Sequence, residues 1–116
     1  MIKAFGHAFD GIIKTMRTER NFRIHIFFGI LAVIGCIIFR VAAWQAVAVA
    51  FAIFFVLAME LMNTAIEALT DLSCKGKIHP LAKTAKDAAA GAVLLAAVLA
   101  VAIGAIVFVP EILDLF

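Results

Sequence analysis

Three long uncharged stretches constrain the fold of this chain more than any other feature of its sequence, and they cover Ile24–Phe39, Val41–Met59 and Ala88–Pro110. A transmembrane helix needs about 20 mostly apolar residues, so the third stretch suffices alone, the second nearly so, and the first with its flanking residues. The composition agrees, because 66% of the 116 residues are hydrophobic and only 16% are charged, more apolar surface than a soluble chain of this length could bury. The sequence therefore predicts an all-α membrane protein with three transmembrane helices.

The first stretch has an alternative explanation as the hydrophobic region of a signal peptide. Val41-Ala42-Ala43 would then be the cleavage site. Arg40 directly before that site, and the two apolar stretches that follow it, favour a transmembrane helix instead.

The distribution of Lys and Arg predicts the orientation in the membrane. Residues 1–23 hold five basic side chains and residues 75–86 hold four, whereas the opposite side of the spans has only Arg40. By the positive-inside rule, the N-terminus and the loop over 72–86 are cytoplasmic in a multi-pass protein of the cell membrane. Trp44 suits the far interface, and Pro110 is expected to end the third helix there. The net charge of +2 is too small and scattered to indicate a nucleic-acid partner.

The N-terminal segment, residues 1–20, has the pattern of an amphipathic surface helix. Apolar side chains recur on one face at helical spacing while basic and polar ones fill the other; the apolar set is Phe5, Ala8, Phe9, Ile12, Ile13 and Met16. The pattern fits a helix on the cytoplasmic leaflet, where anionic lipid attracts basic residues. A cytosolic helix packed on a partner would show the same pattern. With helices over about 22–40, 43–72 and 83–109, residues 1–116 form a single membrane domain.

A stripe of polar side chains continues out of the second apolar stretch, and it consists of Glu60, Asn63, Thr64, Glu67 and Asp71. These spacings place all five on one face of a helix. Measured from Trp44, Glu60 lies about 24 Å along the helix, so the stripe runs from the inner edge of the hydrocarbon into the cytoplasmic interface. A solvated helix end would explain Asp71 and partly Glu67, but not the restriction to one face. Ionisable residues at such depth indicate a functional site.

Further charged residues lie at a matching depth: Glu19 before the first span, and Lys83, Lys86 and Asp87 before the third. Carboxylates together with an amide suit Mg²⁺, which takes oxygen ligands and is typically held by one or two carboxylates plus substrate phosphates. The plainer alternative for Glu19–Arg23 and Lys83–Asp87 is pairing between residues four apart on a helix. His25 is expected to be an interfacial hydrogen-bonding side chain, because no second metal ligand lies at helical spacing from it.

Three segments together resemble one known family over nearly the whole chain. They are E-L-M-N-T-A-I-E over 60–67, K-T-A-K-D-A-A-A-G-A-V-L over 83–94, and E-R-N-F-R-I-H over 19–25, and they resemble the prokaryotic integral-membrane diacylglycerol kinases. The segment over 19–25 is similar to the branch that phosphorylates undecaprenol, whereas the other branch tends to carry a carboxylate near the position of His25. The resemblance implies an ATP- and Mg²⁺-dependent lipid kinase that makes undecaprenyl phosphate or phosphatidic acid.

The resemblance also implies roles for individual residues. Glu60 would be the catalytic general base, and Glu19 and Glu67 would hold Mg²⁺ with ATP. Asn63, Lys86 and Asp87 would complete the ATP-binding site, and the loop over 77–79, which differs from the family, would touch the nucleotide.

Similar proteins are homotrimers with sites between neighbouring subunits at the cytoplasmic interface, so the resemblance implies a trimeric bundle. The residues of the third span agree with an oligomer, because three short helices could not bury the whole polar stripe. Small side chains there would let helices approach closely; they are Ala88–Ala92, Ala96, Ala97 and Ala100. We therefore expect a homo-oligomer in which Glu19 or Lys86 meets the stripe of a neighbouring subunit.

A rival function is a non-enzymatic pore or assembly subunit whose acidic stripe lines a cation path. Such a stripe should reach both faces of the membrane. Here it stops at Glu60, and neither Val41–Met59 nor Ala88–Pro110 contains an ionisable group. The sequence therefore favours the enzyme.

Overall fold

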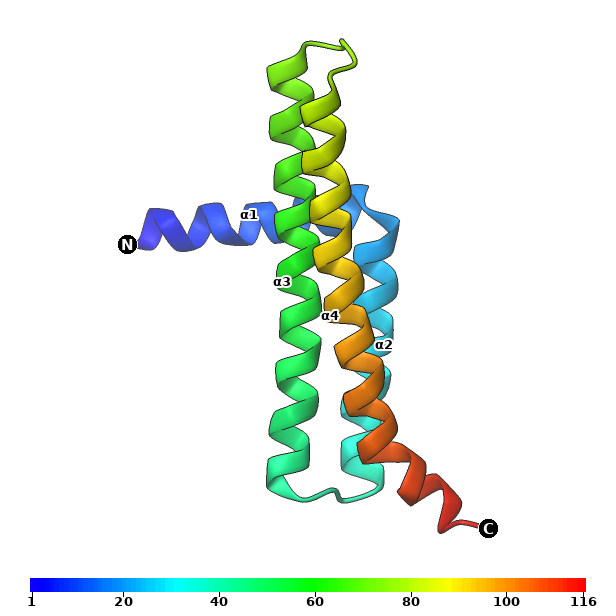
Figure 1. Cartoon of the computed structure of the whole chain (residues 1–116). Helices are drawn as coiled ribbons and strands as arrows, with labels where there is room; N and C mark the ends of the chain where they lie inside the picture. The colour runs from blue at the N-terminus through cyan, green and yellow to red at the C-terminus, as the bar shows by residue number, and fades with distance from the viewer.

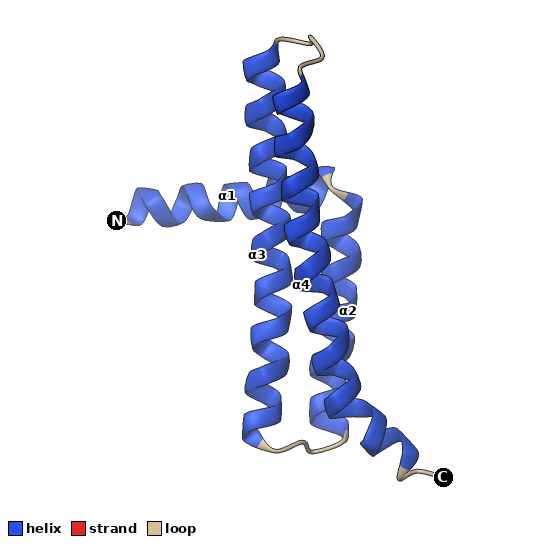
Figure 2. Cartoon of the chain, viewed as in Figure 1, coloured by secondary structure: helices blue, strands red, loops and turns tan.

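The computed structural model describes residues 1–116, and it contains four helices and no strands (Figures 1 and 2). The helices are α1 (Ile2–Thr18), α2 (Arg20–Ile38), α3 (Ala43–Cys74) and α4 (Pro80–Leu113). Helices α2, α3 and α4 run alongside one another, and each is long and apolar enough to cross a membrane. The all-α architecture with three spans is thus confirmed.

Helix α1 lies across the long axis of the other three helices (Figure 1). Its apolar face is exposed, with Phe5 and Phe9 each more than half accessible. Arg23 of α2 holds the junction between the two helices, because its guanidinium donates to the carbonyls of Met16 and Arg17 in α1 at 2.9 and 3.1 Å. Phe22 is buried directly beside this bend in the sequence. These contacts hold α1 at its angle to the bundle.

The core of the bundle lies mainly between α3 and α4, and α2 packs chiefly against α3. The buried apolar side chains of α3 and α4 are small: Val49, Ala52 and Val56 from α3, and Ala89, Ala96 and Val107 from α4. Small residues let helices approach closely where lipid provides no hydrophobic drive for association. Ala89 and Ala96, which the sequence suggested would contact a neighbouring subunit, pack inside the protomer, so that expectation is wrong for these two residues.

Two short connections set where α3 begins and where α4 begins. At the start of α3, the Gln45 side chain accepts the Ala42 backbone N–H at 2.8 Å, which satisfies a donor left free at the helix start. After α3 the chain turns through Lys75 and Gly76, both at positive φ. The His79 Nδ1 then accepts the Leu81 N–H at 3.1 Å and caps α4. The resulting α3–α4 hairpin extends well beyond the level of α1 (Figure 1).

The expectation that Pro110 ends the third helix is wrong. Helix α4 continues through Pro110 to Leu113, and its last part turns away from the bundle in Figure 1. Proline lacks the N–H for the bond to the residue four back, and its ring crowds that carbonyl. A bend in the helix relieves both effects if the residues after the proline still form helical hydrogen bonds. They do so here, because the Asp114 N–H donates to the Pro110 carbonyl at 3.1 Å.

Candidate active site

The polar stripe of α3 becomes steadily more exposed toward the α3–α4 hairpin. The Glu60 side chain is only 6% exposed, Asn63 and Glu67 are half-buried, and the Asp71 side chain is 67% exposed. The protomer leaves Asp71 exposed, as expected of three helices that could not bury the whole stripe, but it buries Glu60. The packing of α2 against α3 covers this carboxylate.

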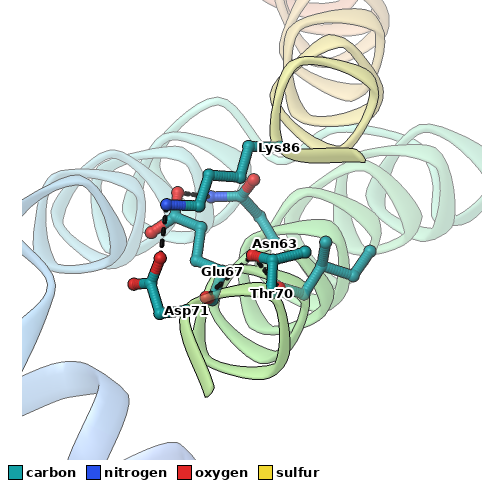
Figure 3. Close-up of polar contacts among 6 residues, drawn as sticks. Asn63, Glu67, Thr70, Asp71 and Lys86 are labelled. Carbon is teal, nitrogen blue, oxygen red and sulfur yellow. Dashed lines mark hydrogen bonds and ion pairs between the residues drawn. The ribbon is translucent and has the colours of Figure 1, made fainter. Parts of the chain in front are cut away.

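Asn63 and Glu67 form a pair within α3. The Asn63 Nδ2 donates to the Glu67 Oε1 at 2.9 Å (Figure 3), which orients both side chains. The Asn63 Oδ1 is buried and has no hydrogen-bond partner, and an unsatisfied buried acceptor costs about 1–3 kcal/mol. Such an atom is ready to accept a donor or to bind a cation. Thr64 differs from its neighbours, because its hydroxyl donates to the Glu60 backbone carbonyl at 3.0 Å and so serves the helix.

Lys86 and Asp87 of α4 have different partners. The Lys86 Nζ donates to the Asp71 Oδ1 across the two helices (Figure 3). Lys86 thus meets the stripe of its own chain, and a contact with a neighbour's stripe stays a prediction. Asp87 is paired with Lys83 at 2.6 Å, the plain pairing considered from the sequence. Both of these side chains are well exposed, so their pairing adds little stability.

Glu19 lies at the junction between α1 and α2 and forms no ion pair with Arg23, whose guanidinium is bound to the end of α1. The simple pairing of these two residues, four apart, is therefore absent. The Glu19 carboxylate keeps its oxygens free for another ligand.

His25 is the residue whose role the sequence did not reveal. Its Nε2 lies 3.2 Å from the Glu60 Oε1. The sequence suggested a polar interfacial side chain, but no spacing rule joins two residues on different helices. Only the packing of α2 on α3 brings them together.

An apolar groove of about 600 Å³ lies among α2, α3 and α4, with His25 among its lining residues. Small residues of two helices line it: Gly29, Ala32 and Gly35 from α2, and Ala97, Ala100 and Gly104 from α4. Because His25 is near the start of α2 and the groove extends to Phe39 near its end, it runs along most of that helix. The groove therefore links the Glu60–His25 pair to the apolar interior of the bundle.

A second, polar pocket of about 440 Å³ lies at the α3–α4 hairpin. Three lysines line it, Lys77, Lys83 and Lys86, together with Asp71 and Asp87. Lysine ammonium groups are suited to phosphate oxygens. His79 also lines the pocket, although its Nδ1 is engaged in capping α4.

Two polar side chains of α3, Asn63 and Glu67, carry the oxygen atoms that Mg²⁺ prefers. No group of three or more His, Cys, Asp or Glu side chains lies together in the chain. Mg²⁺ is commonly held by one or two carboxylates, with the remaining positions taken by water and substrate phosphates. Glu67 beside the unpartnered Asn63 Oδ1 fits a Mg²⁺ ion that arrives with a nucleotide.

These features define a membrane protein with a polar site at the edge of its spans. Comparison with known proteins identifies the family: the model described as "Prokaryotic diacylglycerol kinase" matches residues 6–108. The chain is 39% identical over 115 residues to a diacylglycerol kinase of Synechocystis sp., covering 99% of this chain and 66% of that protein. It is 42% identical over 109 residues to an undecaprenol kinase of Bacillus subtilis, covering 94% of this chain and 88% of that protein. The chain belongs to the prokaryotic diacylglycerol kinase family, which confirms the resemblance.

Proposed function

We propose that this protein is a lipid kinase that transfers the γ-phosphate of ATP, with Mg²⁺, to the hydroxyl of a membrane lipid, either undecaprenol or diacylglycerol. The observation that carries this proposal is the contact between His25, which lines the apolar groove, and the buried Glu60. This contact places a groove with room for a lipid chain next to the Glu60 carboxylate. Glu60 lies on the same helical face as Asn63 and Glu67. The names of the relatives from Synechocystis and Bacillus support this class of reaction.

The lipid would bind with one hydrocarbon chain in the groove and its hydroxyl beside Glu60. Glu60 then acts as the general base that accepts the hydroxyl proton, a role in which a positioned carboxylate contributes about 10²–10⁴-fold. Holding the hydroxyl in line with the γ-phosphate supplies much of the remaining acceleration, because phosphoryl transfer depends chiefly on positioning and charge stabilisation.

The nucleotide would bind toward the hairpin, where the polar pocket holds three lysines. Glu67 and Glu19 would hold Mg²⁺, and Asn63 would contribute its free Oδ1. When bound, Mg²⁺ neutralises charge on the phosphates. Lys86 has three N–H donors, so it can contact a phosphate while keeping Asp71, and Asp87 would position Lys83 at the pocket rim.

The site would face the cytoplasm in the cell membrane, with the N-terminus on the same side. The excess of Lys and Arg in residues 1–23 and 75–86 supports this orientation. The placement of α1 across the bundle, with exposed Phe5 and Phe9, supports a helix lying in the membrane surface.

The active unit would be a homotrimer in which Glu19 completes the site of a neighbouring subunit. The incomplete set of metal ligands in one chain supports a contribution from a second one. The alternative function as a pore is not supported, because the groove is apolar and the stripe reaches no deeper than Glu60.

The direct test is transfer of labelled phosphate from ATP to lipid by the purified protein in detergent. Undecaprenol and diacylglycerol are compared in the same detergent at equal mole fraction. Transfer to either lipid supports a lipid kinase, and the faster one is the main acceptor. If neither lipid is labelled by protein that is folded and supplied with Mg²⁺, the proposed function is wrong.

Substitution of the two metal-binding carboxylates is expected to weaken binding of the Mg²⁺–nucleotide complex. In Glu67→Gln and Glu19→Gln one oxygen ligand loses its charge, so the KM for ATP should rise by about tenfold or more, and excess Mg²⁺ should restore part of the rate. Glu111→Gln, at the far end of α4, is the matched control. An unchanged Mg²⁺ dependence in both variants would place the metal elsewhere.

Filling the groove is expected to weaken lipid binding without affecting ATP. A Cβ on Gly104 would meet no atom within 4 Å, so Gly104→Leu should project into the groove at little cost to folding. We expect the KM for lipid to rise by about tenfold while the KM for ATP stays constant, because only one substrate loses its contacts.

Ala102→Leu adds a similar volume on the exposed side of α4 and serves as the control. Equal lipid KM values for the two variants would show that no lipid chain occupies the groove.

A further inference from the structure

Glu60 has one side chain within ion-pair distance in the chain, and that side chain is His25. The chain contains three ion pairs, and the contact between the His25 Nε2 and the Glu60 Oε1 is the only one that involves Glu60. No side-chain hydrogen bond from another residue reaches this carboxylate. The two side chains differ in access, with Glu60 6% exposed and His25 28% exposed.

A carboxylate so well hidden is stable in its charged form only if a partner compensates for lost water. The His25 imidazole, whose Nε2 lies 3.2 Å from one carboxylate oxygen, supplies that partner when Nε2 carries a proton, and it limits rotation of the carboxylate. It occupies Oε1 and leaves Oε2 available. Because His25 belongs to α2, the packing of α2 on α3 fixes where the His25 ring lies relative to the Glu60 carboxylate.

We propose that His25 is a positioning residue that holds the Glu60 carboxylate ready to receive the proton of the lipid hydroxyl. This inference rests on the proposed function, in which Glu60 is the general base. His25 also lines the groove, so one side chain connects the place where the lipid chain would lie with the group that activates its hydroxyl.

The step balances without any change in the protonation of His25. The hydroxyl O–H bond breaks and its proton moves to the Glu60 Oε2, while the oxygen forms a bond to the γ-phosphorus of ATP. The bond from that phosphorus to the bridging oxygen breaks, and ADP leaves with the electron pair. Glu60 releases its proton to water after the product departs, and the His25 Nε2 keeps its proton throughout.

The first test compares three variants by kcat and KM for both substrates. His25→Phe removes the donor and should lower kcat by about 10–100-fold with an unchanged KM for ATP, whereas His25→Gln keeps an N–H donor in a similar place and should retain kcat within about threefold. His7→Phe, an exposed histidine of α1, is the matched control. If folded His25→Gln is as impaired as His25→Phe, the ring does more than donate, and the positioning role is wrong.

The second test places His25→Phe in a Glu60→Gln background. A residue that acts only through Glu60 has nothing left to position there, so the double variant should be no slower than Glu60→Gln alone. A further loss of tenfold or so would overturn the inference, because it would show an independent role for His25. Thermal unfolding in detergent identifies variants that fail to fold. If His25→Phe fails to fold, the same comparison is made with His25→Gln.

The two proposals fail in different ways. Absence of phosphate transfer by the wild-type chain contradicts the proposed function. Normal transfer by the wild-type chain, its loss in Glu60→Gln and its full retention in His25→Phe would support the function and contradict the role of His25.

Discussion

Glu60→Gln is expected to reduce phosphate transfer to lipid by about 10²–10⁴-fold, the usual contribution of a general base. The amide has nearly the same shape as the carboxylate but is a much weaker base, so it does not accept the hydroxyl proton. Glu60 is buried beside His25 and away from the lysines of the polar pocket, so nucleotide binding should stay near its normal strength. The measurements are the rate of labelled transfer and the Kd for ATP with Mg²⁺.

Glu111→Gln controls for replacing a glutamate in this chain, because Glu111 lies beyond Pro110 at the other end of α4. It should leave transfer unchanged. Activity of Glu60→Gln above roughly a tenth of the wild-type value would contradict the role of Glu60 as general base.

Mixing two impaired variants is expected to restore activity. If a site combines Glu60 of one subunit with Glu19 of its neighbour, a Glu19→Gln chain beside a Glu60→Gln chain forms one intact site. Random mixing at equal amounts should recover about a quarter of the wild-type activity, because each site draws its two parts from adjacent chains of a ring. The experiment unfolds and co-refolds the variants, or co-expresses them, and follows activity against their ratio.

The control is each variant alone at the same total concentration, which should keep its own reduced activity. Two differently tagged chains verify that mixed oligomers form. Co-assembly without recovery at any ratio would mean that each site is built within one chain, and the shared site would be wrong while the lipid kinase function could still hold.

The candidate site shows how far periodicity reaches. Glu60, Asn63 and Glu67 were predicted to share one face because their spacing follows the turn of a single helix, and the structure places Asn63 and Glu67 in contact. The contact of Glu60 with His25 was not predicted, because it depends on a second helix. Asp87 is a simpler case. Its partner is Lys83, four residues earlier on the same helix, and helical spacing alone suggested this pair.

Hydropathy and residue spacing were enough to predict the three spans, the amphipathic N-terminal helix, the polar stripe and the family, because each depends on residues near one another along the chain. The tertiary structure was needed to learn that His25 meets Glu60, that Lys86 meets Asp71 of its own chain, and that small residues of α2 and α4 line a groove. It also decided that α4 continues past Pro110. The physical reason is that hydropathy and helical period are local properties, whereas the rotation and depth of one helix against another are set by side-chain packing across the whole bundle.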